Sequence, residues 1–353
     1  MATRKKAHAT GGTVRFALDG EIVGLDNIDP TRTVLQYLRE DCGRTGSKEG
    51  CAEGDCGACT VVVGELAGNG VRFRAINSCI QFVPTLDGKE LITVESLKGA
   101  DGALHPVQRA MVDCHGSQCG FCTPGFVMSL FALYKSAEAP SREDINDALA
   151  GNLCRCTGYR PIVDAARKMY EYGRDAEATH ENWMNCSFAS PNETDANGRE
   201  HEMVERLRSI QRRDTLALSN GARSYFAPAT LAELAELREA YPDARILAGG
   251  TDVGLWVTKQ LRELAAIIYT GNVAELKRIE TTDAHLNIGA AVSLTDAYAA
   301  IVAEYPDLDE LARRFASPPI RNAGTLGGNI ANGSPIGDSM PILIALGATL
   351  VLR

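Results

Sequence analysis

Residues 50–61 read GCAEGDCGACTV and place three cysteines, Cys51, Cys56 and Cys59, among three glycines. A disulfide would use only two of these thiols, and the glycines would weaken a regular helix or strand. Glycine permits positive φ angles and lets backbone N–H groups turn toward a bound anion. The stretch therefore predicts a loop wrapped around a group that several thiolates hold.

A fourth cysteine, Cys79, follows Cys59 by twenty positions. The spacing C-x4-C-x2-C with a distant fourth cysteine is typical of plant-type [2Fe–2S] clusters. A structural zinc site is the alternative, because four thiolates also suit zinc. Zinc sites usually carry paired C-x2-C motifs, so the triplet favours an iron–sulfur cluster.

A second group of cysteines lies in CGFCTPG (residues 119–125) and NLCRCTGYRP (residues 152–161). The C-x2-C pair, Cys119 and Cys122, is by itself ambiguous between zinc, a redox dithiol and a cluster. The C-x-C pair, Cys154 and Cys156, holds two thiolates close together on one short segment, which fits one iron of a binuclear cluster. The remaining thiols are predicted to be free cysteines: Cys42, Cys114 and Cys186.

Composition limits the class of protein. The 353 residues suffice for two or three domains, and 45% hydrophobic with 23% charged residues is ordinary for a globular chain. The net charge of −9 argues against a nucleic-acid partner. No apolar run is long enough to span a membrane, and the basic start lacks the apolar core of a secretory signal. Eleven cysteines without such a signal favour metal or redox chemistry in the cytoplasm over disulfides.

The pattern along the chain predicts an α+β multidomain protein. Alternating apolar residues at 13–18 and 21–25, split by Asp19-Gly20, indicate a hairpin. A short helix is expected in 31–41 and a β-branched strand in 59–66. The predicted domains are a tail at 1–12, a cluster domain at 13–93, a helical cluster domain at 94–175, a linker at 176–210 and a third domain at 211–353.

The helical period of about 3.6 sets in after residue 96. Four helices are expected, in residues 105–116, 123–136, 141–152 and 160–173, with Ser141 and Asp144 as a capping box. The third domain should hold a helix over 230–240 and strands near 245, 264–271 and 285–294. A compact four-helix domain between two α/β units is the predicted order.

Three stretches carry a resemblance to a known family: TGSKEGCAEGDCGACTV (45–61), CGFCTPGFVMSL (119–130) and GNLCRCTGYRPIVDA (151–165). They resemble the iron–sulfur domains of the molybdenum hydroxylases, which include xanthine dehydrogenases, aldehyde oxidases and carbon monoxide dehydrogenases. The resemblance implies a ferredoxin-like β-grasp domain and a four-helix domain, each with one [2Fe–2S] cluster. It implies that the second cluster lies nearer the molybdenum cofactor and the first nearer a flavin. Gln118 matches a family glutamine that contacts molybdopterin of a partner; apart from the family it reads as an exposed amide.

Two glycine-rich stretches of the third domain, LAGGTDV (247–253) and AGTLGGNIANGSPIGD (323–338), follow probable strands. Neither is a GxGxxG fingerprint, so alone they predict only loops that could cradle phosphate, with tight turns as the alternative. They are similar to the FAD-binding domain of the same enzymes. The resemblance implies these FAD contacts: Leu247, Ala248, Gly249, Gly250, Thr251, Asp252, Val253, Phe315, Thr325, Gly327, Gly328, Asn329 and Asp338.

This domain order resembles the small subunit of bacterial xanthine dehydrogenases. In that family the flavin subunit continues beyond the point where this chain stops. The apolar stretch PILIALGATLVLR (341–353) is expected to form a strand with an unpaired edge. We therefore expect an incomplete FAD domain, either in a fragment or completed by another chain.

The resemblance implies an electron-transfer subunit of a xanthine dehydrogenase. A molybdopterin-binding partner would hydroxylate hypoxanthine or xanthine to urate, and electrons would pass through two [2Fe–2S] clusters to FAD and then NAD+. No residue of this chain is expected to catalyse the hydroxylation, and a heterotetramer of two such pairs is implied. The alternatives are the same electron chain in an aldehyde, nicotinate or aromatic-CoA hydroxylase, a zinc-dependent interaction module, and a non-functional fragment.

Overall fold

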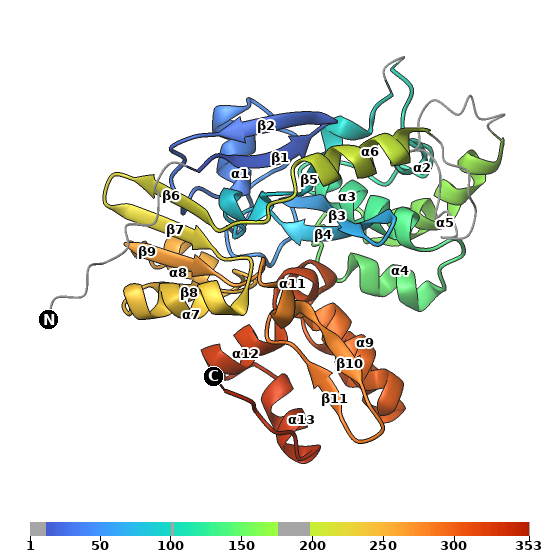
Figure 1. Ribbon diagram of the computed structural model, residues 1–353. Helices are drawn as coiled ribbons and strands as arrows, with labels where there is room; N and C mark the ends of the chain where they lie inside the picture. Colours follow the sequence, from blue (N-terminus) through green and yellow to red (C-terminus); the bar gives the residue numbers. More distant parts are fainter. Residues whose placement is uncertain (1–11, 100–101, 176–197, 353) are drawn as a thin grey trace, which may run out of the picture.

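The structure is a computed structural model that describes residues 12–99, 102–175 and 198–352 (Figure 1). Its first unit is a five-stranded mixed sheet in the order β2-β1-β5-β3-β4. Strand β1 pairs with β5 in parallel and the other pairs are antiparallel. The strands are β1 (Val14–Leu18), β2 (Glu21–Leu25), β3 (Thr60–Ala67), β4 (Gly70–Asn77) and β5 (Glu90–Ile92). The hairpin and the strand after the cysteine loop are confirmed.

A short helix crosses this sheet, as predicted for 31–41. Thr33 caps helix α1 (Val34–Gln36), which continues as a π-helical turn, η1 (Tyr37–Asp41). Val34 and Leu38 are fully buried in the core that the sheet shares with this helix. Two 3-10 turns, η2 (Val83–Leu86) and η3 (Val94–Leu97), close the unit.

Four helices form the second unit, as the period predicted: α2 (Pro106–Asp113), α3 (Thr123–Ser136), α4 (Arg142–Leu149) and α5 (Arg160–Asp175). The capping box of α4 is confirmed, because the Asp144 amide donates to Ser141 Oγ at 3.1 Å and the Ser141 amide donates to Asp144 Oδ2 at 2.9 Å. The apolar face of α3 packs against the first sheet through one continuous core that includes Val62, Phe126 and Phe131. The two cluster units therefore share a core.

Most of the part of the predicted linker (176–210) that the structure describes is helical. Residues Gly198–Ser209 form helix α6, and the preceding residues 176–197 lie outside the described part. Met203 and Leu207 are one helical turn apart, and both are buried in the core of the cluster units. Most residues of this helix are polar and its apolar stripe is narrow, so the sequence pattern did not predict a helix here.

The third unit begins with a four-stranded sheet in the order β6-β7-β9-β8. Its elements are β6 (Leu216–Asn220), β7 (Arg223–Ala227), α7 (Leu231–Ala240), β8 (Arg245–Leu247), α8 (Val253–Thr258) and β9 (Ala266–Tyr269). Tyr225 and Ile267 from this sheet pack in the same core as Phe16 and Val61 of the first sheet. The two sheets are thus joined by buried apolar side chains.

The lower lobe in Figure 1 holds a hairpin and five helices. Its elements are η5 (Ala274–Lys277), β10 (Ile279–Thr281), β11 (Leu286–Ile288), α9 (Leu294–Glu304), η6 (Pro306–Leu308), α10 (Asp309–Arg314), α11 (Pro318–Ala323), α12 (Leu326–Asn332) and α13 (Ser339–Ala345). The strand expected over 341–353 is wrong for residues 341–345, which belong to α13. A short apolar run does not distinguish a helix from a strand by itself, and here Ile342 packs into the core of the lobe.

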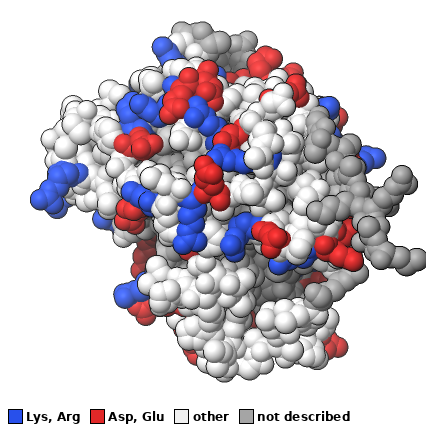
Figure 2. Space-filling view, turned by 90° about the vertical axis from the view of Figure 1, so that its left-hand side faces the viewer, with Lys and Arg blue, Asp and Glu red and all other residues white. Residues whose placement is uncertain are grey.

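On the face shown in Figure 2, acidic and basic side chains are interspersed over the upper part, and the lobe below carries few charges. Ile336 and Ile344 of this lobe are 83% and 79% exposed. Among the helices in the described ranges, none combines the length and the apolar composition needed to cross a membrane. The predicted domain boundaries stay predictions.

Candidate functional site

The first cysteine group lies in the loop before β3 and just after β4. Gly54 and Gly57 have φ angles of 80° and 70°, the left-handed conformation expected of this loop. The backbone N–H groups of Asp55 and Cys56 lie 3.4 and 3.3 Å from Cys51 Sγ. These donors point into the loop, where they can stabilise negative charge on sulfur.

The electrostatics favour thiolates at Cys51 and Cys59, whereas burial raises the pKa of Cys56. The pKa of Cys51 is lowered to about 3, first by hydrogen bonding from the Cys79 thiol and then by backbone N–H groups. The Cys79 thiol also lowers the pKa of Cys59, and sharing its proton raises its own pKa. Cys59 and Cys79 are 1% and 3% exposed. The loop thus brings the first predicted ligand set together, partly shielded from water.

A glycine and a side-chain amide lie next to these sulfurs. A Cβ atom added at Gly50 would lie 2.8 Å from Cys56 Sγ, so only glycine leaves room beside that sulfur. The amide of Asn77 lies 3.8 Å from Cys59 Sγ and adds a donor from the opposite wall. Thiolate ligands surrounded by N–H donors are the environment that a [2Fe–2S] cluster takes.

The second group pairs thiols from two loops, one before α3 and one before α5. Cys122 is hydrogen-bonded to Cys154, and Cys119 to Cys156. Thr157 Oγ1 lies 3.3 Å from Cys154 Sγ, a further polar contact to sulfur. The structure therefore brings together the second predicted ligand set as two pairs, which fits a binuclear cluster. In the part of the chain that the structure describes, no three His, Cys, Asp or Glu side chains are placed to hold a single metal ion.

One side of the second group is open to the surface, while Cys154 is buried and Cys122 is half-buried. Cys119 and Cys156 are exposed, and Phe121, Leu153 and Tyr159 around them are 47%, 56% and 39% exposed. An exposed apolar rim of this kind is typical of a docking surface.

Gln118 is exposed at this rim, and its Nε2 donates to the carbonyl oxygen of Cys156 at 3.0 Å. This hydrogen bond ties the loop before α3 to the loop before α5. The contact of Gln118 with molybdopterin stays a prediction.

The two cysteine loops touch through their backbones. The amide N–H of Leu153, next to Cys154, donates to the carbonyl of Cys56 at 3.0 Å. The Asn152 side chain, 3% exposed, donates to the carbonyl of Gly57 at 3.2 Å. Ser129 Oγ donates to the Asn152 side-chain oxygen at 2.7 Å and so orients the amide. Asn152 was not among the predicted site residues. The only sequence signal for it is its position two residues before Cys154.

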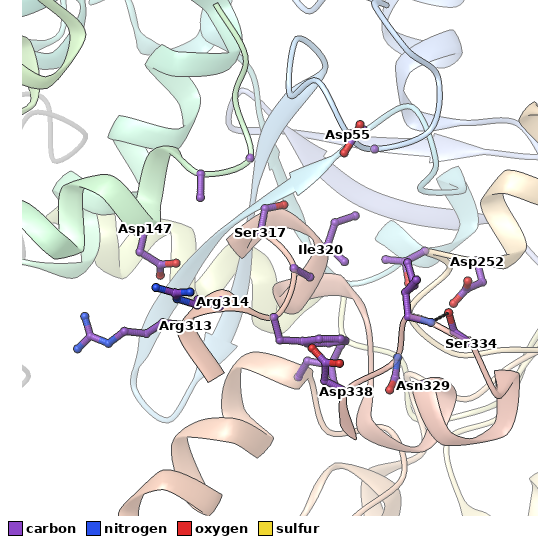
Figure 3. A pocket seen from close by; sticks show the side chains of 18 of the residues that line it. Asp55, Asp147, Asp252, Arg313, Arg314, Ser317, Ile320, Asn329, Ser334 and Asp338 are labelled. Atoms are coloured by element: carbon purple, nitrogen blue, oxygen red, sulfur yellow. Dashed lines mark hydrogen bonds between the residues drawn. The ribbon is translucent and has the colours of Figure 1, made fainter. Parts of the chain in front are cut away.

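A cavity of about 1250 Å³ lies between the first cysteine loop, helix α4 and the third unit (Figure 3). Glu53, Gly54 and Asp55 of the cysteine loop line one wall. Five of the residues predicted to bind FAD also line it: Thr251, Asp252, Phe315, Asn329 and Asp338. The first cysteine loop and the predicted flavin residues thus share one cavity.

The other predicted FAD residues lie around this cavity rather than in its wall. Ala248, Gly249 and Thr325 line a second cavity of about 510 Å³. Leu247 and Val253 pack in the core that joins the two sheets. The remaining positions, which line neither cavity, are Gly250 with a φ of 80°, Gly327 packed against Ala290, and Gly328 beside Thr325.

Two features of these loops fit a bound cofactor that offers hydrogen-bond donors such as hydroxyl groups, as FAD does. The side-chain oxygen of Asn329 is buried and has no hydrogen-bond partner in the described part of the chain. A Cβ at Gly249 would lie 2.0 Å from the carbonyl oxygen of Ala323, so the two glycine-rich loops approach at backbone distance. An unsatisfied buried polar atom is costly and is usually met by a ligand or by water.

Three family models match the chain. Residues 16–82 match a 2Fe-2S iron-sulfur cluster binding domain, residues 93–167 a [2Fe-2S] binding domain, and residues 219–353 the FAD binding domain in molybdopterin dehydrogenase. The chain therefore has two [2Fe–2S] domains and an FAD-binding domain. These matches confirm the predicted fold class and cofactors, while the individual ligand residues stay predictions.

The xanthine dehydrogenases that are similar to this chain are much longer than it. The xanthine dehydrogenase of Emericella nidulans is 35% identical over 97% of this chain and 28% of its own length. That of Drosophila pseudoobscura pseudoobscura is 36% identical over 95% of this chain and 27% of its own length. The solved structure of quinoline 2-oxidoreductase from Pseudomonas putida 86 is 31% identical over 48% of this chain and 100% of that chain, with a TM-score of 0.41. The chain thus spans little more than a quarter of the two dehydrogenases.

Proposed function

Since this chain is an iron–sulfur and FAD chain of the xanthine dehydrogenase type, we propose that it conducts electrons from a molybdenum cofactor on a partner to NAD+. When bound, the [2Fe–2S] clusters supply one-electron transfer, and FAD supplies the two-electron transfer to a nicotinamide. The chain's own residues hold, space and shield these groups.

One observation carries this proposal: the three sites form a contiguous series. The hydrogen bond from Leu153 N–H to the Cys56 carbonyl joins the second cysteine loop to the first. Gly54 and Asp55, which directly precede Cys56 in the first loop, line the cavity that the predicted flavin residues share. Electrons entering at Cys119 or Cys156 would therefore cross a short, bonded path toward the flavin cavity.

The side at which a partner could reach the clusters follows from exposure. Cys119 and Cys156 are exposed within an apolar rim, whereas Cys59 and Cys79 are buried. A molybdopterin-binding partner seated on that rim would reach the second cluster and Gln118 without displacing the first. We propose hypoxanthine and xanthine as the partner's substrates, a heterotetramer of two pairs, and the cytoplasm, whose reducing conditions keep thiols free, as the location.

Metal and flavin analysis of the anaerobically purified chain tests the proposal. We expect about four irons, about four acid-labile sulfides and about one FAD per chain, as two [2Fe–2S] clusters and one flavin require. Cys154→Ser should reduce the iron to about two per chain, because only the second cluster loses a ligand. Cys42→Ser is the matched control, since Cys42 lies outside both ligand sets, and should leave iron unchanged. Zinc in place of iron, or equal iron in wild type and Cys154→Ser, would contradict the assignment.

A further inference from the structure

The buried guanidinium of Arg321, in α11, connects the wall of the large cavity to the helical cluster unit. Its Nη1 donates to the carbonyl oxygens of Arg313, Phe315 and Ala316 at 2.8, 3.1 and 2.8 Å. Its Nη2 donates to both carboxylate oxygens of Asp147 at 2.7 Å. Arg321 is only 7% exposed, so the guanidinium is buried, while the Asp147 side chain that accepts from it is 33% exposed. One side chain thus fixes the end of α10 and ties it to α4.

The segment that Arg321 holds carries a predicted flavin contact. Phe315 lines the cavity and packs edge-on against Tyr298 with ring centroids 5.6 Å apart. The following residue, Ala316, has a φ of 54°, a left-handed conformation that is costly for a residue with a Cβ. The hydrogen bond from Arg321 to its carbonyl is charge-assisted and stabilises this conformation. The place of the Phe315 ring therefore depends on Arg321.

Asp147 completes the arrangement from the helical cluster unit. A buried guanidinium needs a counter-charge, and the Asp147 carboxylate supplies it by accepting from Nη2 on both of its oxygens. Figure 3 shows Asp147 on α4 at one side of the cavity, with Asp252 and Asn329 at the other. Close packing supports the same junction, because a Cβ at Gly151 would lie 2.9 Å from Ser317 Oγ.

We propose that Arg321 and Asp147 form a positioning pair that sets the Phe315 wall of the flavin site from the helical cluster unit. Neither residue has to touch FAD: Asp147 acts through Arg321, and Arg321 acts through the backbone of residues 313–316. The inference rests on the proposed function, because it takes FAD as the occupant of the cavity. It makes the unit that holds the second cluster a determinant of flavin affinity.

The test is an FAD titration of the deflavinated, iron-replete full chain, followed by flavin fluorescence. Asp147→Asn preserves size but removes the charge, and should weaken FAD binding about tenfold. The visible circular dichroism of the bound flavin should change, while iron content and the paramagnetic resonance spectra of the reduced clusters stay as in wild type. Arg321→Lys, which lacks the planar fork, should weaken binding at least as much. The double variant should bind FAD no more than about twofold more weakly than Arg321→Lys does, because both changes act through the same guanidinium group.

Glu143→Gln is the matched control. Glu143 lies on the same helix as Asp147 and pairs with Arg313 of α10 at 3.7 Å, but its side chain is 82% exposed. Such a pair contributes little, so FAD affinity should change less than about twofold.

Two failures are distinguishable. A wild-type chain with full iron that binds no FAD would refute the proposed function. A wild-type chain that binds FAD, with Asp147→Asn binding it equally and with an unchanged dichroism spectrum, would overturn the positioning pair alone. If Asp147→Asn also loses iron, Asp147→Glu, which keeps the negative charge, separates a positioning role from a purely structural one. Retained iron with near wild-type FAD affinity supports the pair, and loss of both reveals a purely structural role.

Discussion

Gly57 lies at the closest approach of the two cysteine loops. Its φ is 70°, and a Cβ at this position would lie 2.1 Å from the carbonyl oxygen of Gly151. From the other side, a Cβ at Gly125 would lie 2.1 Å from the carbonyl oxygen of Gly57. Glycine is required at both places by space, and at Gly57 also by conformation. Both cluster loops therefore depend on a single peptide group.

Replacing Gly57 with alanine should disturb both clusters. The left-handed backbone alone costs alanine about 1–2 kcal/mol, and the clash with the Gly151 carbonyl forces the loops apart in addition. We expect Gly57→Ala to lower the iron content of both clusters, measured by metal analysis and by the resonance spectrum of each cluster. Gly68→Ala is the control: Gly68 has a φ of 62° but nothing within 4 Å of its added Cβ. It should lower the melting temperature by a few degrees with full iron; equal iron loss in both variants would refute the contact argument.

Glu90 makes stability depend on pH. It is 2% exposed, and burial raises its pKa from 4.5 to about 7, although the Gly20 N–H and Arg206 oppose the shift. Below pH 4.5 the carboxyl is neutral in both folded and unfolded chains. Between pH 4.5 and about 7 it ionises only in the unfolded chain, so stability falls by roughly 3 kcal/mol as pH rises, and levels off above that.

Glu90→Gln should remove this part of the pH dependence. The melting temperature of the variant, compared with wild type from pH 4.5 to 8, should show a shallower fall and a higher value at pH 8. The Gly20 N–H, which donates to Glu90 Oε1 at 3.1 Å, keeps an acceptor in the glutamine. Parallel curves for the two proteins would show that Glu90 is ionised in the folded state throughout this range.

At the scale of elements, helix α6 covers the cluster units with a narrow apolar stripe. Met203, Leu207 and Ile210 are buried together with side chains of the first sheet and of α3. The helix also brings Arg206 to within 3.7 Å of the buried Glu90 carboxylate. A segment with the composition of a linker thus serves as part of the core.

Leu207→Ala should show that α6 is structural. Leu207 is fully buried, and loss of such a side chain lowers the free energy of unfolding by about 2–4 kcal/mol. Glu205→Ala, on the exposed face of the same helix, should change it by less than about 0.5 kcal/mol. Thermal and denaturant unfolding of the two variants measures the difference. Equal effects would mean that α6 does not pack as described.

The elements predicted correctly are those with a local cause. The Asp19-Gly20 turn and the Ser141–Asp144 capping box each act within a few residues, so the sequence alone reveals them. Helix α6 and helix α13 were misjudged for the opposite reason. Their apolar residues are buried only by segments far away in the sequence. Leu207 packs in the core that contains side chains of the first sheet, and Ile342 packs in the core of the lobe.

At the scale of the molecule, the units are joined by shared cores and a shared cavity. The first sheet packs against α3 on one side and against β7 and β9 on the other. The large cavity takes walls from all three predicted domains, through Asp55, Asp147 and Phe315. Contacts between residues so far apart leave no periodicity or motif in the sequence. The family resemblance therefore predicted flavin-binding residues but not the Arg321–Asp147 pair.

The contact at Gly57 also limits how this chain can be varied or recombined. A peptide group that two loops enclose from both sides leaves neither loop free to change its backbone alone. A chimaera that exchanged only one of the two iron–sulfur modules with a relative would have to preserve the facing glycines and Asn152. An exchange should therefore move the two modules together, including the second cysteine loop.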